Sequence, residues 1–220
     1  MKLSQRTMSI LKNFAKISER GVYFNAGQTQ KAMTTSKSVF VEAVFDESFP
    51  KEFGIYDLNK FLSLLSLFND PELEFNEKNI VIKEGNSTAT YWFSSKEMIK
   101  NVPPADKSIS LKSVDAAFEL SKENLSHLLK ASAAMGLSNF VIEGDGKNLL
   151  LTVRDEEEQT SNKISKVVGE TTGEFRFVGD VDNLKMMEDD YDVQVSKAGI
   201  IQFNSKNSEI KYWCAIRRNA

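Results

Sequence analysis

Lysine and arginine side chains at helical spacing are the residues of this chain best suited to binding a ligand. At 100° per residue, Arg6, Lys12 and Lys16 fall on one half of a helical wheel, and no acidic residue interrupts the range 4–18. The like charges at Lys12 and Lys16 weaken an isolated helix by roughly 0.2–0.5 kcal/mol. Phosphates would compensate them, because cations on a smooth helical face contact a nucleic-acid backbone without reading its sequence. The pattern predicts a salt-sensitive phosphate-binding face, with ordinary solvated lysines as the alternative.

Catalytic chemistry has no comparable set of residues. His127 is the only histidine and is placed on a predicted helix, far from any strained Gly-rich turn that would hold a nucleophile. The range 144–147, Gly-Asp-Gly-Lys, lacks the full spacing of a phosphate-binding loop and is interpreted as a tight hairpin turn. The acidic runs 155–158 and 188–192 lack EF-hand spacing, which favours solvated loops. We therefore expect no enzyme, no cofactor and no metal site.

Two sets of predicted elements carry these side chains, and the first occupies the N-terminal half. Its first helix covers about 4–18, with Ser4 as a plausible N-cap. Short apolar runs between 22 and 45 have strand composition. A second helix over 55–68 is apolar around most of its circumference, so we expect it to be largely buried. Further short strands are predicted between 72 and 93.

A degraded copy of this set returns about 120 residues later. Its helices are expected over 121–135 and 180–187, with strands between and after them. A polar stretch with a Pro-Pro pair, about 94–113, is the predicted connector. The sequence therefore predicts two similar α+β domains, 1–100 and 101–220, in a symmetrical scaffold whose function lies in a surface.

Composition and charge limit the classes of protein that fit. The 220 residues are 41% apolar and 27% charged, which fits packed globular cores and argues against a membrane protein. No stretch approaches the length of a membrane span or of an export signal. The single cysteine, Cys214, is expected to be a buried strand thiol in a reducing compartment. Net charge is −3, although the range 4–18 holds three cations and no anion, so nucleic acid would be confined to one side of an acidic body.

Motifs along nearly the whole chain resemble one protein family, the sliding clamps, or DNA polymerase processivity factors, of T-even-type tailed bacteriophages. The resemblance is sparser in the second half. The motifs are Met1-Lys2-Leu3-Ser4, Leu11-Lys12-Asn13-Phe14-Ala15, Ile55-Tyr56-Asp57-Leu58-Asn59, Phe61-Leu62, Leu65-Ser66-Leu67, Asn69-Asp70, Leu128-Leu129-Lys130 and Leu184-Lys185-Met186.

The resemblance implies a DNA clamp fold, in which each of two similar domains packs two helices on antiparallel sheets and six domains form a ring. A chain of two domains then implies a homotrimer that encircles duplex DNA and tethers the replicative DNA polymerase. The implied partners also include an ATP-driven clamp loader, and a late-transcription coactivator and sigma-like factor, all in the cytoplasm of the infected bacterial host. Partner peptides would bind beside the connector, about 94–113. A non-encircling peptide-binding adaptor is the alternative function.

The resemblance also assigns residues to the inner, DNA-facing wall. Lys12, Lys130 and Lys185 match basic positions of the family directly, whereas the other members of the set follow only from their helix placement. Asp57, Asp180 and Asp182 are interpreted as helix-capping carboxylates. Edge strands at the outer end of each domain should pair between subunits. The residues that follow from helix placement are Arg6, Lys16, Lys60 and Lys122.

Overall fold

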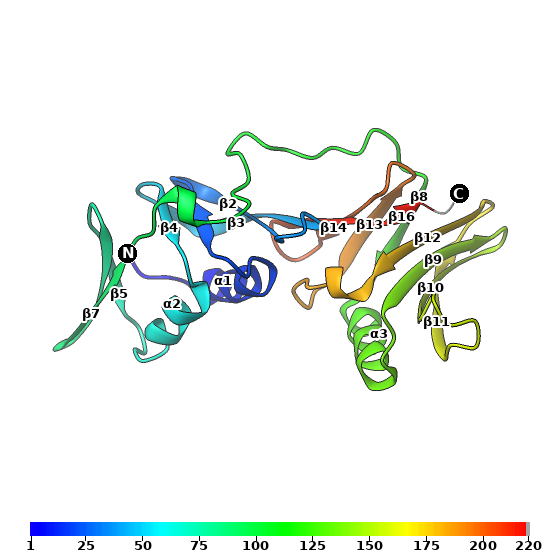
Figure 1. Ribbon diagram of the computed structural model, residues 1–220, viewed down its shortest axis with the longest axis horizontal. Helices are drawn as coiled ribbons and strands as arrows, with labels where there is room; N and C mark the ends of the chain where they lie inside the picture. Colours follow the sequence, from blue (N-terminus) through cyan, green and yellow to red (C-terminus); the bar gives the residue numbers. More distant parts are fainter. Residues whose placement is uncertain (219–220) are drawn as a thin grey trace. The chain divides into compact units, whose positions relative to one another are not determined.

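The computed structural model describes residues 1–218 and resolves the chain into two compact units, Met1–Ser108 and Ile109–Ala220 (Figure 1). Both units consist mainly of antiparallel strands with few helices, which confirms the predicted α+β class. The break between the units falls inside the predicted connector, about 94–113.

Unit 1 has two helices and three groups of antiparallel strands. Strand β2 pairs with β3, β1 pairs with β4, and β5, β6 and β7 form a three-stranded sheet in that order. The elements are α1 (Gln5–Ile17), β1 (Val22–Phe24), β2 (Gly27–Met33), β3 (Val39–Phe49), β4 (Phe53–Ile55), α2 (Leu58–Leu65), β5 (Glu72–Phe75), β6 (Asn79–Glu84), β7 (Ser87–Trp92) and the 3-10 helix η1 (Lys96–Met98).

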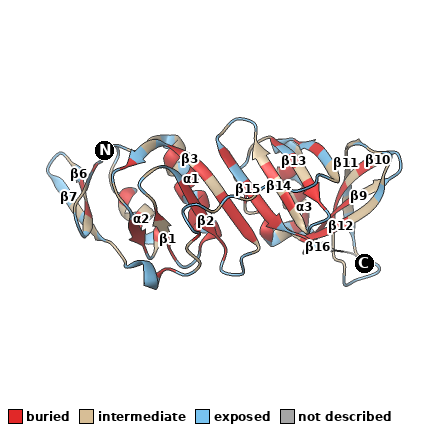
Figure 2. Ribbon diagram, turned by 90° about the horizontal axis from the view of Figure 1, so that it is seen from above, coloured by how far each residue is buried: buried red, intermediate tan, exposed pale blue. Residues whose placement is uncertain are grey.

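Local capping and an apolar face account for α1. The Ser4 hydroxyl accepts a hydrogen bond from the Thr7 amide at 3.0 Å, as expected of an N-cap. Helix α1 packs against β3 and β2. Seven of its residues are buried, and most residues of β3 are buried as well (Figure 2). Helix α2 is shorter than the predicted 55–68, because Ile55 belongs to β4 and Asp57 caps the helix by accepting from the Lys60 amide.

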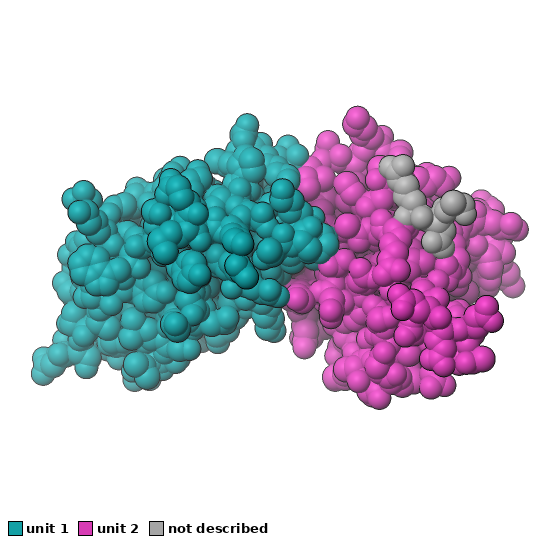
Figure 3. All heavy atoms as spheres, viewed as in Figure 1, with its two compact units in different colours: residues 1–108 teal, residues 109–220 magenta. Residues whose placement is uncertain are grey.

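Unit 2 is drawn in magenta in Figure 3. As far as residue 218 it has one α-helix and two groups of strands. One sheet has the order β11-β10-β9-β12-β16, and in the other β14 pairs with β15 and β13, and β13 pairs with β8. The elements are β8 (Ala116–Leu120), α3 (Lys122–Met135), β9 (Asn139–Asp145), β10 (Asn148–Arg154), β11 (Lys163–Glu170), β12 (Glu174–Asp180), the 3-10 helix η2 (Val181–Asn183), β13 (Tyr191–Ser196), β14 (Ile200–Ser205), β15 (Ile210–Ala215) and β16 (Arg217–Arg218).

Local sequence also determines the ends of α3 and the turn after β9. Ser121 caps the helix by accepting from the Asn124 amide at 3.2 Å, and Gly136 ends it in the left-handed conformation with φ 67°. The predicted hairpin turn at 144–147 is confirmed, because β9 and β10 pair on either side of it and Gly146 has φ 83°.

The predicted helix over 180–187 was wrong: only one 3-10 turn, Val181–Asn183, forms there. Side chains of unit 2 take up the backbone groups that a helix would use. The Tyr191 hydroxyl donates to the Met187 carbonyl at 2.6 Å, and the Met187 amide donates to the Tyr212 hydroxyl at 3.2 Å. Three consecutive acids follow at 188–190, at the end where a helix dipole disfavours negative charge. Unit 1 therefore has the two expected α-helices, and the described part of unit 2 has one.

Candidate nucleic-acid interface

The outer face of α1 carries a row of exposed polar side chains at helical spacing. Gln5, Ser9, Lys12 and Lys16 are exposed, whereas Asn13, expected on the same half of the wheel, is buried. Within residues 1–218, neither Lys12 nor Lys16 forms an ion pair. The two ammonium groups are therefore available to an external anion.

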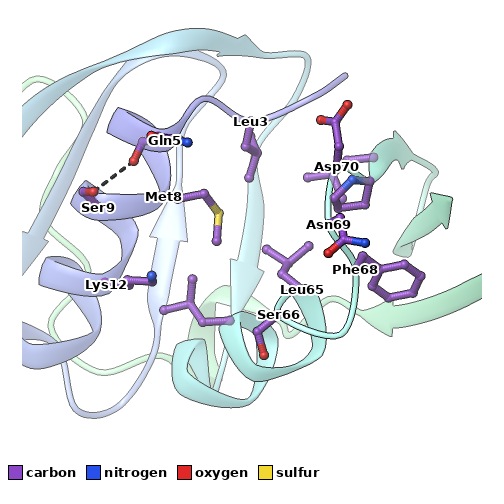
Figure 4. A pocket seen from close by; sticks show the side chains of 13 residues that line it. Leu3, Gln5, Met8, Ser9, Lys12, Leu65, Ser66, Phe68, Asn69 and Asp70 are labelled. Carbon is purple, nitrogen blue, oxygen red and sulfur yellow. Dashed lines mark hydrogen bonds between the residues drawn. The ribbon is translucent and has the colours of Figure 1, made fainter.

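A hollow of about 410 Å³ lies beside Lys12, between α1, α2 and the loop that follows α2 (Figure 4). Its walls are mostly apolar or neutral, and Met8 and Leu65 face each other across it in the close view. The one carboxylate among its lining residues is Asp70, which is already paired with Lys2. The hollow therefore offers Lys12 no unengaged carboxylate.

Arg6 occupies a different place from the exposed lysine row. It is half-buried and pairs with Asp46 of β3 at 2.5 Å. The Ser4 hydroxyl and the Arg6 guanidinium hold the pKa of the Asp46 carboxyl below its usual value. Glu47 completes this contact by accepting a hydrogen bond from the Thr7 hydroxyl. Arg6 thus fastens the start of α1 to β3.

Two further predicted residues, Lys60 and Lys122, are exposed but paired. Lys60 lies 3.4 Å from Asp57, three residues earlier, and Lys122 lies 3.6 Å from Glu188. Exposed pairs of this kind contribute about 0–1 kcal/mol, so a phosphate could displace either carboxylate at little cost.

The remaining two predicted residues, Lys130 and Lys185, differ in accessibility. Lys130 is exposed on α3 and forms no ion pair with any residue from 1 to 218. The small exposed side chains of Ala133 and Ala134 follow it on the helix. Lys185 is half-buried after the 3-10 turn and already engages a neighbouring group. The structure therefore leaves Lys12, Lys16 and Lys130 as the exposed, unpaired members of the predicted set.

The groups considered for other chemistry lie in ordinary structural roles. Among the described residues, no three His, Cys, Asp or Glu side chains gather as metal ligands.

The acidic loop at 155–158 was expected to be solvated, but its Glu156 carboxylate accepts a hydrogen bond from Arg176 at 2.6 Å and pairs with Arg154 at 3.0 Å. No helix in the described part of the chain is long and apolar enough to cross a membrane.

Comparison with known proteins extends the agreement across the whole chain. Residues 2–101 match the family model of the DNA polymerase processivity factor, and residues 117–217 match that of the gp45 sliding clamp, C terminal. The sliding clamp of Vibrio phage KVP40 is 31% identical over 208 residues, which cover 92% of this chain and 94% of that protein. The chain belongs to the phage sliding-clamp family. The clamp of Enterobacteria phage T4 is 28% identical over 216 residues and covers 94% of both chains.

Solved structures independently show that the fold is that of a clamp. The A. fulgidus PCNA structure with the C-terminal region of FEN-1 superposes with a TM-score of 0.71 at 14% identity and covers 100% of both chains. The Bartonella birtlesii DNA polymerase III beta clamp gives a TM-score of 0.74 at 15% identity and covers 100% of this chain and 65% of that one. These identities support the fold alone.

Family membership confirms two of the predictions made from sequence. The resemblance to clamps of T-even-type phages was correct, and the protein is a processivity factor rather than an enzyme. Neither comparison tests which residues face DNA, so the roles of the clamp's lysines remain predictions.

Proposed function

We propose that this clamp encircles duplex DNA as a homotrimeric ring and tethers the phage replicative DNA polymerase to its template. The observation that carries the proposal is the set of unpaired, exposed lysines on α1 and α3, Lys12, Lys16 and Lys130, in a chain whose net charge is −3. Lysines of this kind would contact phosphates of any sequence, which sliding requires. The acidic remainder would keep DNA away from the other surfaces.

Free strand edges in both units support closure into a ring. Within residues 1–218, no strand pairs with the outer edge of β7 or of β11. The opposite edge of the three-stranded sheet is covered, since the Leu73 amide donates to the Met1 carbonyl at 2.7 Å. Each free edge carries an exposed apolar side chain: Trp92 is 65% exposed on β7 and Val167 is 62% exposed on β11. Pairing β7 of one subunit with β11 of the next would cover both edges in a closing, head-to-tail contact.

The connector is the proposed site for partner proteins, which would include the polymerase, the clamp loader, the late-transcription coactivator and the sigma-like factor. Its first part is held on unit 1 by Lys31, a β2 residue that is only 7% exposed. The Lys31 ammonium donates to the Ala105 carbonyl at 2.7 Å and the Lys107 carbonyl at 2.6 Å. Because this backbone is already held in one conformation, less conformational entropy is lost when a peptide binds beside it. The proposed place of action is the cytoplasm of the infected bacterial host.

Native mass spectrometry at micromolar concentration tests the assembly. The proposal expects a species with three times the chain mass of 24.8 kDa. Replacement of Trp92 by Lys, which puts a charge on the β7 edge, should shift the population toward single chains. A wild-type protein that stays monomeric under these conditions would favour the alternative, a peptide-binding adaptor that never encloses DNA.

A further inference from the structure

A second hollow in unit 2 brings together cations from a helix and from an edge strand. It has a volume of about 780 Å³ and lies along the exposed side of α3. Lys122 and Lys130 reach it from α3, and Lys166 reaches it from β11. Of these three lysines, Lys122 and Lys130 belong to the DNA-facing set predicted from sequence and Lys166 does not, because strand alternation does not reveal which helix a strand residue lies against.

The register of β11 explains why Lys166 lies on the side of the sheet that α3 covers. Lys166 is paired across the ladder with Leu151 of β10. Leu151 is 4% exposed, and together with Leu125 and Leu128 of α3 it lines a small apolar cavity in the core of unit 2. Directly opposite residues of neighbouring strands share a face, so Lys166 leaves the sheet toward α3. Its side chain is half-buried, as expected of a stem that packs on apolar groups while the ammonium reaches water.

Two carboxylates line the hollow, Asp190 and Glu123, and Glu123 is exposed at the start of α3 and forms no ion pair with any residue from 1 to 218. Lys122 pairs with Glu188 at 3.6 Å, and the Asp190 carboxylate accepts from the Lys122 amide at 2.7 Å. Lys130 and Lys166 form no ion pair with any residue from 1 to 218. Two unpaired ammonium groups therefore open into one hollow.

This arrangement gives unit 2 the same number of free cations as the helix face of unit 1. On α1 both are helical, Lys12 and Lys16, whereas α3 has Lys130 alone because Lys122 is paired. Lys166 supplies the second cation from the neighbouring strand. A phosphate backbone spaced at one charge per about 1.7 Å of duplex axis would meet two lysines in each unit.

We propose that Lys166 and Lys130 together form the phosphate-binding site of unit 2, so that an edge strand as well as the helices contacts duplex DNA. The inference rests on the proposed DNA-encircling function and adds to it a residue outside the helices. Lys163 provides a matched comparison, because it lies on the same strand three residues away, is exposed, and by alternation faces the side of the sheet opposite to Lys166.

The test measures the salt dependence of association between the full-length clamp and a short fluorescent linear duplex, which can thread a ring. The variants are Lys166→Gln, Lys130→Gln and Lys163→Gln, each checked for assembly by native mass. If one copy of each lysine touches DNA at a time, Lys166→Gln and Lys130→Gln should each lower the magnitude of the slope of log K against log salt by about 0.9, with Lys163→Gln unchanged.

Three outcomes would contradict either the inference or its basis, and they are distinguishable. If Lys130→Gln lowers the slope while Lys166→Gln behaves like Lys163→Gln, the assignment of Lys166 fails and the proposed function stands. If Lys166→Gln dissociates the assembly while Lys163→Gln does not, Lys166 acts between subunits rather than on DNA. If the wild-type protein shows no salt-dependent association, the proposed function itself fails.

Discussion

Removing the three exposed, unpaired lysines of the predicted set should weaken DNA association without unfolding the protein. The variant is Lys12→Gln/Lys16→Gln/Lys130→Gln, in which glutamine has a helix propensity close to that of lysine and is still polar. None of the three side chains has an ion-pair partner among residues 1–218, so no internal ion pair is lost. Relief of the repulsion between Lys12 and Lys16 should stabilise α1 by roughly 0.2–0.5 kcal/mol.

The expected loss of affinity follows from counterion release. Each lysine that contacts a phosphate contributes about 0.9 to the slope of log K against log salt. Between 50 and 200 mM salt, each such contact therefore changes the association constant by about 3.5-fold. If one copy of each lysine touches DNA at a time, the wild-type clamp should lose about 40-fold more affinity over that range than the variant does.

Fluorescence anisotropy with a labelled duplex over a salt series measures the two slopes, and urea unfolding measures stability. The matched control replaces three other exposed lysines that lie on strands and turns, Lys78, Lys163 and Lys211, so that it has the same net charge. Equal slopes for the wild type and the triple variant, or an equal reduction in the control, would refute the assigned DNA-facing surface. A lower unfolding free energy in the triple variant would show that the lysines have structural partners.

Three further predictions concern the scaffold. Lys31→Met leaves the carbonyls of Ala105 and Lys107 without their hydrogen-bond donor. The free energy of unfolding should therefore fall by about 1–3 kcal/mol, and amide hydrogen exchange should become faster at 101–107. Unchanged exchange at 101–107 would contradict the role of Lys31. Gly21 has φ 89°, and in Gly21→Ala the new Cβ would lie 2.6 Å from the Ile55 carbonyl oxygen. Urea unfolding should show a free energy of unfolding lower by about 1–3 kcal/mol, and an unchanged value would refute this backbone strain. Burial raises the pKa of the Cys214 thiol to about 12, so iodoacetamide at pH 8.5 should label the native protein far more slowly than the unfolded protein, and equal rates would contradict the burial. Because an unfolded thiol ionises near pH 8.5, the contribution of this group to stability is complete below that pH and is lost as the pH rises toward about 12.

Sequence predicted best what local chemistry determines. The helix starts at Ser4 and Ser121 follow from side chains that accept hydrogen bonds from amides three residues away. The hairpin around Gly146 follows from the backbone freedom of one residue. These features need no knowledge of the rest of the chain, so periodicity and capping rules were sufficient for them.

Features determined by distant residues were not predictable in the same way. The range 180–187 has helical periodicity, but hydroxyl groups of Tyr191 and Tyr212 bind its backbone in another conformation. A helical wheel placed Arg6 with the lysines, although its partner is Asp46, forty residues along the chain. Lys166 went unnoticed because its position depends on which strand of the sheet α3 covers.

Under the proposed function, the clamp is held on DNA by topology, and the lysines provide only weak contacts. The most direct measurement is the retention of a cross-linked clamp on DNA in high salt. Cysteines introduced on β7 and β11 are cross-linked between neighbouring subunits after the clamp has been loaded onto DNA. Buried Cys214 should not compete for the bifunctional maleimide. We expect the closed ring to remain on circular duplex DNA and to slide off the same DNA once it is made linear. Equal retention on circular and linear DNA would contradict encirclement.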